Sequence, residues 1–139
     1  MTAAHYRRAV SVTPSTVLVV DDSDTIRSLI VLNLELDGFT VVGARDGQEC
    51  LDIVKDVAPE LITLDVAMPR RDGFSTVEML RADPDTKHIP IVMVSARAQG
   101  SDLARGQELG VDAYLTKPFE PEELVATVRS LVADGTRPH

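Results

Sequence analysis

The stretch Val17-Leu18-Val19-Val20-Asp21-Asp22 is a short apolar run that ends in two carboxylates. Three later runs share this arrangement, in which apolar residues lead into a polar one: Leu61–Asp65, Ile91–Ser95 and Tyr114–Lys117. Short apolar runs that are rich in β-branched residues and bounded by polar or turn residues are typical of buried strands. The sequence therefore predicts several buried strands, each with a polar side chain at its carboxyl end.

Segments with a helical spacing of apolar residues separate these strands. The expected strands are Val17–Asp21, Thr40–Ala44, Leu61–Asp65, Ile89–Ser95 and Asp112–Thr116. The expected helices are Asp24–Asp37, Gly47–Ala58, Phe74–Arg81, Gln99–Leu109 and Pro121–Val132. This strict alternation predicts an α/β fold, in which helices cover both faces of a parallel sheet. A chain of 139 residues suits one domain, which we expect at residues 16–133, with flexible tails at 1–15 and 134–139.

The polar residues at the strand ends are expected to meet, because the carboxyl ends of parallel strands gather at one edge of a sheet. That edge would hold three carboxylates, a hydroxyl and an ammonium group, from Asp21, Asp22, Asp65, Ser95 and Lys117. Like charges 4 Å apart repel by about 4 kcal/mol at an effective dielectric constant of 20, so such a cluster requires a cation. Oxygen ligands favour Mg²⁺, and Mn²⁺ is an acceptable substitute.

This combination of groups predicts phosphoryl transfer onto a carboxylate. An aspartate can act as the nucleophile and form an aspartyl-phosphate. Lys117 and Ser95 would contact phosphate oxygens and neutralise their charge. Asp65 stands alone at its strand end and suits the attacking role, whereas Asp21 and Asp22 suit the metal, but the residues alone leave this choice open.

Four motifs in order along the chain carry a family resemblance: Val19-Val20-Asp21-Asp22-Ser23, Leu64-Asp65-Val66-Ala67-Met68-Pro69-Arg70-Arg71-Asp72-Gly73, Met93-Val94-Ser95-Ala96 and Tyr114-Leu115-Thr116-Lys117-Pro118-Phe119. Together they resemble the receiver domain of two-component response regulators, over about residues 17–132. The resemblance implies the flavodoxin-like (βα)5 fold, a doubly wound parallel sheet with strand order 2-1-3-4-5. It also implies a signalling switch similar to the chemotaxis regulators.

The resemblance implies that Asp65 accepts a phosphoryl group from a histidine kinase or a histidine phosphotransfer protein. It further implies that Asp22 binds Mg²⁺ directly and Asp21 through water, with Asp65 and the backbone carbonyl of Ala67 completing the protein ligands. Lys117 and Ser95 would contact the phosphate. Ser95 and Tyr114 would move together on activation, and the bond from Lys117 to Pro118 would be cis.

Two further positions of the family pattern, Ala67 and Arg97, flank the phosphate and influence how long it lasts. Because alanine cannot orient an attacking water by hydrogen bonding, we expect slow self-dephosphorylation. Arg71 stands where receivers usually carry an apolar residue. We expect Arg70 and Arg71 to form a solvated loop edge, with a contact to a kinase as the alternative.

The first predicted helix has more apolar residues than one core-facing stripe needs. Its core-facing arc is expected to comprise Ile26, Leu29, Ile30 and Leu34. Leu32 and Leu36 fall outside the centre of that arc, four residues apart on one edge. Exposed apolar stripes often mark partner surfaces, so the two leucines are candidates for docking the phosphodonor; a wide buried face is the alternative.

The amino-acid composition narrows the range of molecules that this protein is expected to bind. A net charge of −8 and an aromatic content of only 4% argue against binding nucleic acid or an anionic membrane. The single cysteine, Cys50, cannot form an intrachain disulfide, and no apolar run reaches the roughly 20 residues of a membrane span. We therefore expect a cytoplasmic monomer, or a weak phosphorylation-dependent dimer, with a downstream protein target.

Because only a short tail follows Val132, the sequence favours a single-domain regulator that is not an enzyme beyond its own phosphorylation and dephosphorylation. A phosphorelay intermediate or a phosphate sink would have the same site. One alternative is a phosphohydrolase of the haloacid-dehalogenase type with Asp22 as nucleophile; against it, the chain is short for that fold and Asp65 would have no role. The other is an interaction module that is never phosphorylated.

Overall fold

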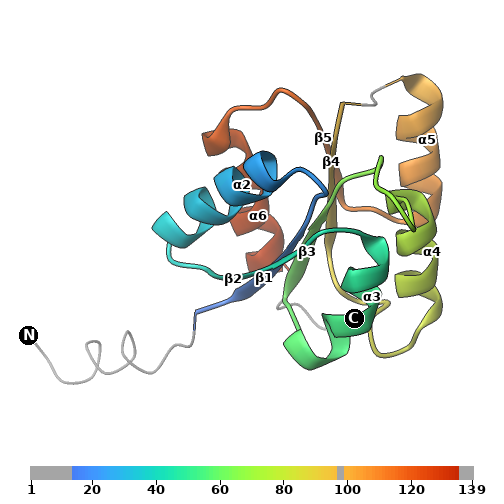
Figure 1. The fold of residues 1–139 in the computed structure, drawn as a ribbon, viewed down its shortest axis with the longest axis horizontal. Helices are drawn as coiled ribbons and strands as arrows, with labels where there is room; N and C mark the ends of the chain where they lie inside the picture. The colour runs from blue at the N-terminus through green and yellow to red at the C-terminus, as the bar shows by residue number, and fades with distance from the viewer. Residues whose placement is uncertain (1–13, 97–98, 135–139) are drawn as a thin grey trace, which may run out of the picture.

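The computed structural model describes residues 14–96 and 99–134, in which five parallel strands lie between two layers of helices (Figure 1). The strands are β1 (Thr16–Val20), β2 (Thr40–Ala44), β3 (Leu61–Leu64), β4 (Ile91–Ser95) and β5 (Ala113–Thr116). The helices are α2 (Asp24–Leu36), α3 (Gly47–Val57), α4 (Gly73–Ala82), α5 (Gly100–Leu109) and α6 (Pro121–Asp134). The predicted elements are all present, with ends that differ by up to two residues.

The strand order is β2-β1-β3-β4-β5, as predicted for a flavodoxin-like fold. The chain passes from β1 to β2 on one side and then to β3 on the other, so the order reverses at β1. Val20, the last residue of β1, pairs with Ala44 of β2 and with Leu64 of β3. This register brings the residues that follow β1 and β3 to the same level of the sheet edge.

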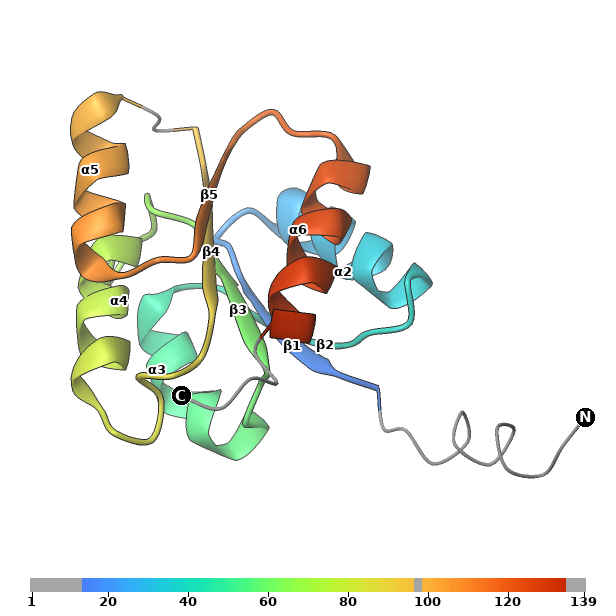
Figure 2. The same cartoon turned by 180° about the vertical axis from the view of Figure 1, so that it is seen from behind.

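Each strand contributes alternate side chains to the two faces of the sheet. Val17 and Val19 pack beneath α2 and α6, whereas Leu18 and Val20 pack beneath α3 and α4. Both views show α2 and α6 on one face and α3, α4 and α5 on the other (Figures 1 and 2). With both faces covered, the three central strands β1, β3 and β4 are almost wholly buried and mostly apolar, as is typical of parallel sheets.

Three helices begin with a side-chain cap. The side chains of Ser23, Asp46 and Asp72 accept hydrogen bonds from backbone N–H groups in the first turns of α2, α3 and α4, at 3.2, 2.8 and 2.8 Å. In contrast, Gln99, which precedes the first residue of α5, makes no side-chain cap, and the buried residues of α5 are Asp102 and Gly106. The helix predicted at Gln99–Leu109 is therefore present and has little apolar contact with the core.

The structure corrects one residue of the predicted core. Leu29 is 42% exposed, whereas Ile30 and Leu34 of the same helix are buried. The stripe of α2 that meets the sheet is narrower than predicted, and Leu29 instead lines a surface pocket of about 360 Å³ beside Lys117 and Phe119. Leu32 and Leu36 are 53% and 77% exposed, so the wide buried face considered for them is excluded.

Cys50 is fully buried in the core, and this burial raises the pKa of its thiol to about 12. Among residues 14–96 and 99–134, no helix has both the length and the apolar character needed to span a bilayer. The predicted tails lie mostly outside the described residues. The backbone carbonyl of Ser15 accepts a hydrogen bond from Thr40 (2.9 Å), and α6 continues to Asp134.

Candidate functional site

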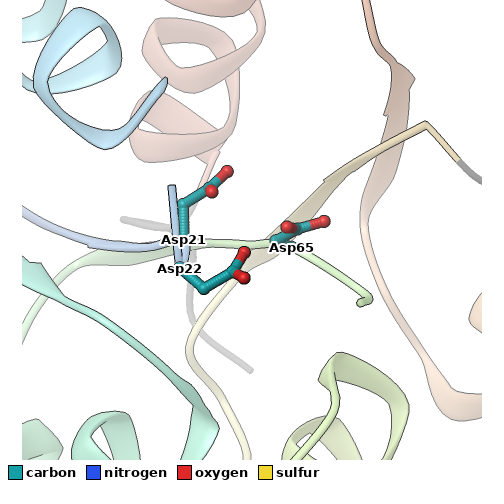
Figure 3. A group of neighbouring side chains, drawn as sticks. All are labelled: Asp21, Asp22 and Asp65. Carbon is teal, nitrogen blue, oxygen red and sulfur yellow. The ribbon is translucent and has the colours of Figure 1, made fainter. Parts of the chain in front are cut away.

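Three carboxylates meet at the carboxyl edge of the sheet (Figure 3). Asp21 and Asp22 directly follow β1, and Asp65 directly follows β3. One oxygen of each lies within 4.8 Å of an oxygen of the other two. Asp21 and Asp65 are buried, at 1% and 5% exposure, whereas Asp22 is exposed. The cluster expected from the strand ends is therefore formed.

Backbone and side-chain hydrogen bonds fix the position of Asp21. Its N–H donates to the carbonyl of Ala44 (3.1 Å), and its Oδ1 accepts from the N–H of Ser23 (2.9 Å). The guanidinium of Arg27 donates to the carbonyl of Asp21 (2.8 Å). The first turn of α2 and the end of β2 thus hold Asp21 from two sides.

Lys117 supplies the positive charge at this edge. Its Nζ lies 3.0 Å from Oδ2 of Asp21 and 3.4 Å from Oδ2 of Asp65. The backbone N–H of Lys117 donates to the carbonyl of Ser95 (2.9 Å), which ties the residue after β5 to the end of β4. The peptide bond from Lys117 to Pro118 is cis, in agreement with the expectation.

The protonation equilibria reflect burial and the neighbouring charges. Burial raises the pKa of Asp65, the negative charge of Asp21 adds to this increase, and Lys117 opposes it. Burial alone would lower the pKa of Lys117, but its hydrogen bond to Asp21 and the attraction of both carboxylates outweigh burial and raise the pKa. Lys117 is therefore protonated at neutral pH and neutralises part of the acidic charge.

The residues present fit a divalent cation. Three carboxylates share one ammonium group, so the group carries excess negative charge. Its donors are hard oxygens from only a few side chains, which suits Mg²⁺ because this ion retains several waters and accepts phosphate oxygens. Exposed Asp22 lies at the open side of the cluster, where a cation can enter.

Ser95, Tyr114 and Ala67 are the other predicted site residues that the structure describes. Ser95 is buried at the end of β4, level with Thr116 of β5. Tyr114 is half-buried, and its ring packs against Gly106 of α5. Ala67 is exposed in the loop that follows Asp65. Arg97 lies outside the described residues, and its predicted influence on phosphate lifetime stays a prediction.

One ion pair near the site was missed from the sequence. The guanidinium of Arg70 donates to both carboxylate oxygens of Asp46, with Nε–Oδ2 at 2.8 Å and Nη2–Oδ1 at 3.0 Å. Arg70 is therefore not simply a solvated loop edge. No spacing links the two residues along the chain, because they follow different strands and meet only in the folded protein.

Comparison with known proteins identifies the family. The sequence profile described as "Response regulator receiver domain" matches residues 17–129. The "Probable transcriptional regulator ycf27" of Porphyridium aerugineum is 41% identical over 84% of this chain, and the "DNA-binding dual master transcriptional regulator RpaA" of Synechocystis sp. is 40% identical over 84%. These alignments cover 47% and 48% of the two relatives, so the chain spans about half their length.

Comparison of the fold with solved structures identifies the same family. The crystallised chemotaxis protein CheY4 of Vibrio cholerae superimposes with a TM-score of 0.81 at 33% identity, covering 86% of this chain and 99% of that one. The family match over residues 17–129 includes the whole acidic cluster and all five strands apart from Thr16, the first residue of β1. For this reason the chain belongs to the response regulator receiver domain family.

Proposed function

We propose that this domain takes a phosphoryl group from a phosphohistidine donor onto Asp65 in a reaction that depends on Mg²⁺. The observation that carries the proposal is the position of the Lys117 ammonium, within 3.4 Å of Asp65 in a cluster that retains excess negative charge. A buried acceptor carboxylate with a cation beside it is the arrangement that phosphoryl transfer needs.

In the proposed step, a carboxylate oxygen of Asp65 forms a bond to phosphorus while the bond from phosphorus to the donor imidazole nitrogen breaks. The imidazole leaves with the electron pair and takes up a proton. A raised pKa increases the basicity of the Asp65 carboxylate, and the charge of Lys117 favours its ionised form. Lys117 and the Ser95 hydroxyl then donate to the oxygens of the transferred group.

Asp21, Asp22, Asp65 and the backbone carbonyl of Ala67 would hold the metal ion. When bound, Mg²⁺ neutralises negative charge on the transferring group. In its absence Lys117 alone opposes three carboxylates, so phosphoryl uptake by the metal-free protein is expected to be slow.

Phosphorylation would change the surface formed by α5, β5 and α6. It adds about −1.5 to −2 charges at Asp65, which Ser95 and Lys117 can follow. Tyr114 packs against Gly106, so a movement of its ring reaches α5 directly. Because α5 lacks a side-chain cap and buries few residues, we propose that it shifts readily.

We propose that the phosphorylated domain passes its signal on by binding a downstream protein through this surface. The same phosphorylation site would also serve a phosphorelay intermediate or a phosphate sink. RpaA is described as DNA-binding, and its aligned part corresponds to this receiver. The receiver itself, with its net charge of −8, is proposed to contact proteins in the cytoplasm as a monomer or a weak phosphorylation-dependent dimer. Its only chemistry would be its own phosphorylation and dephosphorylation.

The test compares the uptake of one phosphoryl group by the protein with the continued hydrolysis of phosphate esters. Incubation with Mg²⁺ and acetyl phosphate should give at most one phosphoryl group per chain, and EDTA should prevent its uptake. Sustained release of phosphate from simple phosphate monoesters would instead favour the phosphohydrolase alternative, with Asp22 as nucleophile. Absence of any adduct, despite Mg²⁺ binding, would favour an interaction module that is never phosphorylated.

A further inference from the structure

The ion pair between Arg70 and Asp46 joins the loop that follows β3 to the start of α3. The side chain of Asp46 is 10% exposed and that of Arg70 is 58% exposed. Oδ1 of Asp46 also accepts the N–H of Glu49 (2.8 Å), so one carboxylate caps α3 and binds the loop. The hydrogen bond from Arg70, with the cap, holds the pKa of Asp46 below its usual value.

Arg70 adopts an unusual backbone conformation. Its φ of 64° lies in the left-handed region, which residues other than glycine and asparagine rarely enter. Such a conformation costs free energy and persists only where surrounding contacts enforce it. Among residues 14–96 and 99–134, only Ala58 shares this feature among residues other than glycine, and Ala58 ends a helix.

Both ends of the loop are fixed, and its middle is held by this ion pair. The N–H of Gly73 donates to the carbonyl of Val66 (2.8 Å), which closes the loop of residues 66–73. The start of α3 is closely packed: a Cβ at Gly47 would lie 2.0 Å from Oγ1 of Thr76 and 2.6 Å from the carbonyl of Arg71. The start of α3 therefore packs directly on the loop and on α4.

Ala67 is the second residue of this closed loop, and its exposed methyl group makes no contribution to the core. Nothing in its own side chain can orient its backbone carbonyl. The direction of that carbonyl must follow from the path of the loop. Two side chains from the middle of the loop reach the start of α3: Arg71 makes one long hydrogen bond to Gln48 (3.4 Å), and Arg70 makes the shorter, bidentate pair with Asp46.

We propose that Arg70 and Asp46 are positioning residues for the metal site, because their ion pair holds the loop of residues 66–73 in the path that directs the Ala67 carbonyl toward the bound cation. This inference rests on the proposed Mg²⁺ site. Residues that orient metal ligands typically change metal affinity by about tenfold or more when altered. Loss of the pair should therefore weaken Mg²⁺ binding while the domain stays folded.

The test measures Mg²⁺ affinity by titrating MgCl₂ into the ¹⁵N-labelled protein and following its NMR spectrum, with no phosphodonor present. The two variants are Arg70→Ala and Asp46→Asn, since asparagine can still cap α3. Arg71→Ala is the matched control: it removes the same charge from the same loop, but Arg71 bonds to Ser75 and Gln48 instead of Asp46. Thermal unfolding in EDTA verifies that each variant is folded.

The two substitutions change the protein charge in opposite directions, so a purely long-range electrostatic effect would move their Mg²⁺ affinities in opposite directions. The ion-pair account predicts about tenfold weaker binding in both, faster amide hydrogen exchange across residues 66–72, and parent-like behaviour of Arg71→Ala. Opposite shifts, or parent-like affinity in both variants, would overturn the inference.

A fourth variant, Arg70→Gly, separates the ion pair from backbone strain. Glycine adopts the left-handed conformation without penalty, but it cannot bind Asp46. The ion-pair account predicts that Arg70→Gly also binds Mg²⁺ more weakly than the parent, and full recovery in this variant would contradict it. If the parent itself bound no Mg²⁺, the proposed function would fail first, and the inference with it.

Discussion

The Nζ of Lys117 lies 3.4 Å from Oδ2 of Asp65, although one residue follows β5 and the other follows β3. The two strands are not neighbours, because β4 lies between them. The contact spans the sheet edge and places a cation beside the proposed phosphoryl acceptor. Replacing Lys117 should therefore affect stability, metal binding and phosphorylation differently from replacing Asp65.

Asp65→Asn is expected to stabilise the metal-free protein at pH 7. The folded-state pKa of Asp65 is raised by burial and by Asp21, so its ionised form carries an energetic penalty that asparagine removes. Thermal unfolding in EDTA should show a midpoint a few degrees higher, as expected for about 1 kcal/mol in a domain of this size. Asp56→Asn, which alters an exposed carboxylate of α3, should leave the midpoint nearly unchanged.

The cost of burying the ionised Asp65 also predicts that the stability difference between Asp65→Asn and the parent depends on pH. Below the unfolded-state pKa of Asp65, its carboxyl group is protonated in both states and destabilises neither. Between the unfolded-state pKa and the higher folded-state pKa, Asp65 has lost its proton in the unfolded protein but still holds it in the folded protein. The parent therefore loses stability as the pH rises through this window. The advantage of Asp65→Asn should thus grow from about pH 4 upward. A constant difference between pH 4 and pH 7 would argue against this assignment.

Lys117→Met should separate metal binding from phosphoryl transfer. Removal of an ammonium that neutralises the transferring group is expected to slow phosphorylation by acetyl phosphate by about 10²-fold. Mg²⁺ should bind at least as tightly as to the parent, because no lysine competes for Asp21 and Asp65. Lys55→Met is the matched control, since Lys55 pairs with Asp83 at 2.9 Å and makes no ion pair with Asp21, Asp22 or Asp65. An unchanged phosphorylation rate would contradict the role of Lys117.

Ala67→Asn should shorten the life of the phosphorylated state. Ala67 is exposed in the loop after Asp65, and asparagine there can hold a water by hydrogen bonding whereas alanine cannot. We expect the parent to retain its phosphoryl group several-fold longer, a modest effect for one group that positions a water. The measurement is the decay of the intact-mass adduct after the donor is removed. A parent half-life shorter than that of Ala67→Asn would refute the expectation.

Leu32→Ser tests whether the exposed face of α2 receives the phosphodonor. Leu29, Leu32 and Leu36 are 42%, 53% and 77% exposed on this helix. The substitution should slow phosphotransfer from a phosphorylated donor protein and leave phosphorylation by acetyl phosphate unchanged. Met79→Ser is a suitable control, because Met79 is 50% exposed on α4, across the sheet. Equal rates from the donor protein for Leu32→Ser and the parent would exclude docking at this leucine.

Strand positions and the acidic cluster were predictable because they depend on local patterns combined with one topological rule. Each strand is a short apolar run, and parallel strands bring their carboxyl ends to one edge. Asp21, Asp22 and Asp65 could therefore be placed together before any contact was known, and one oxygen of each lies within 4.8 Å of the others.

Features that depend on the relative placement of helices and loops were not predictable. Leu29 has the helical spacing of a core residue, but it is 42% exposed, whereas Ile30 and Leu34 of the same helix are buried. Arg70 lies in a polar loop and pairs with Asp46 only because α3 and this loop pack together. The left-handed backbone of Arg70 could not be predicted either, because glycine or asparagine normally occupies such positions and arginine gives no indication of them.

The central claim, that Asp65 accepts the phosphoryl group, is tested most directly by intact-mass measurement after incubation with Mg²⁺ and acetyl phosphate. The parent, Asp65→Asn and Asp22→Asn are compared under the same conditions. The account predicts one added phosphoryl group on the parent and none on Asp65→Asn. An adduct that persists in Asp65→Asn and disappears in Asp22→Asn would contradict it and make Asp22 the nucleophile.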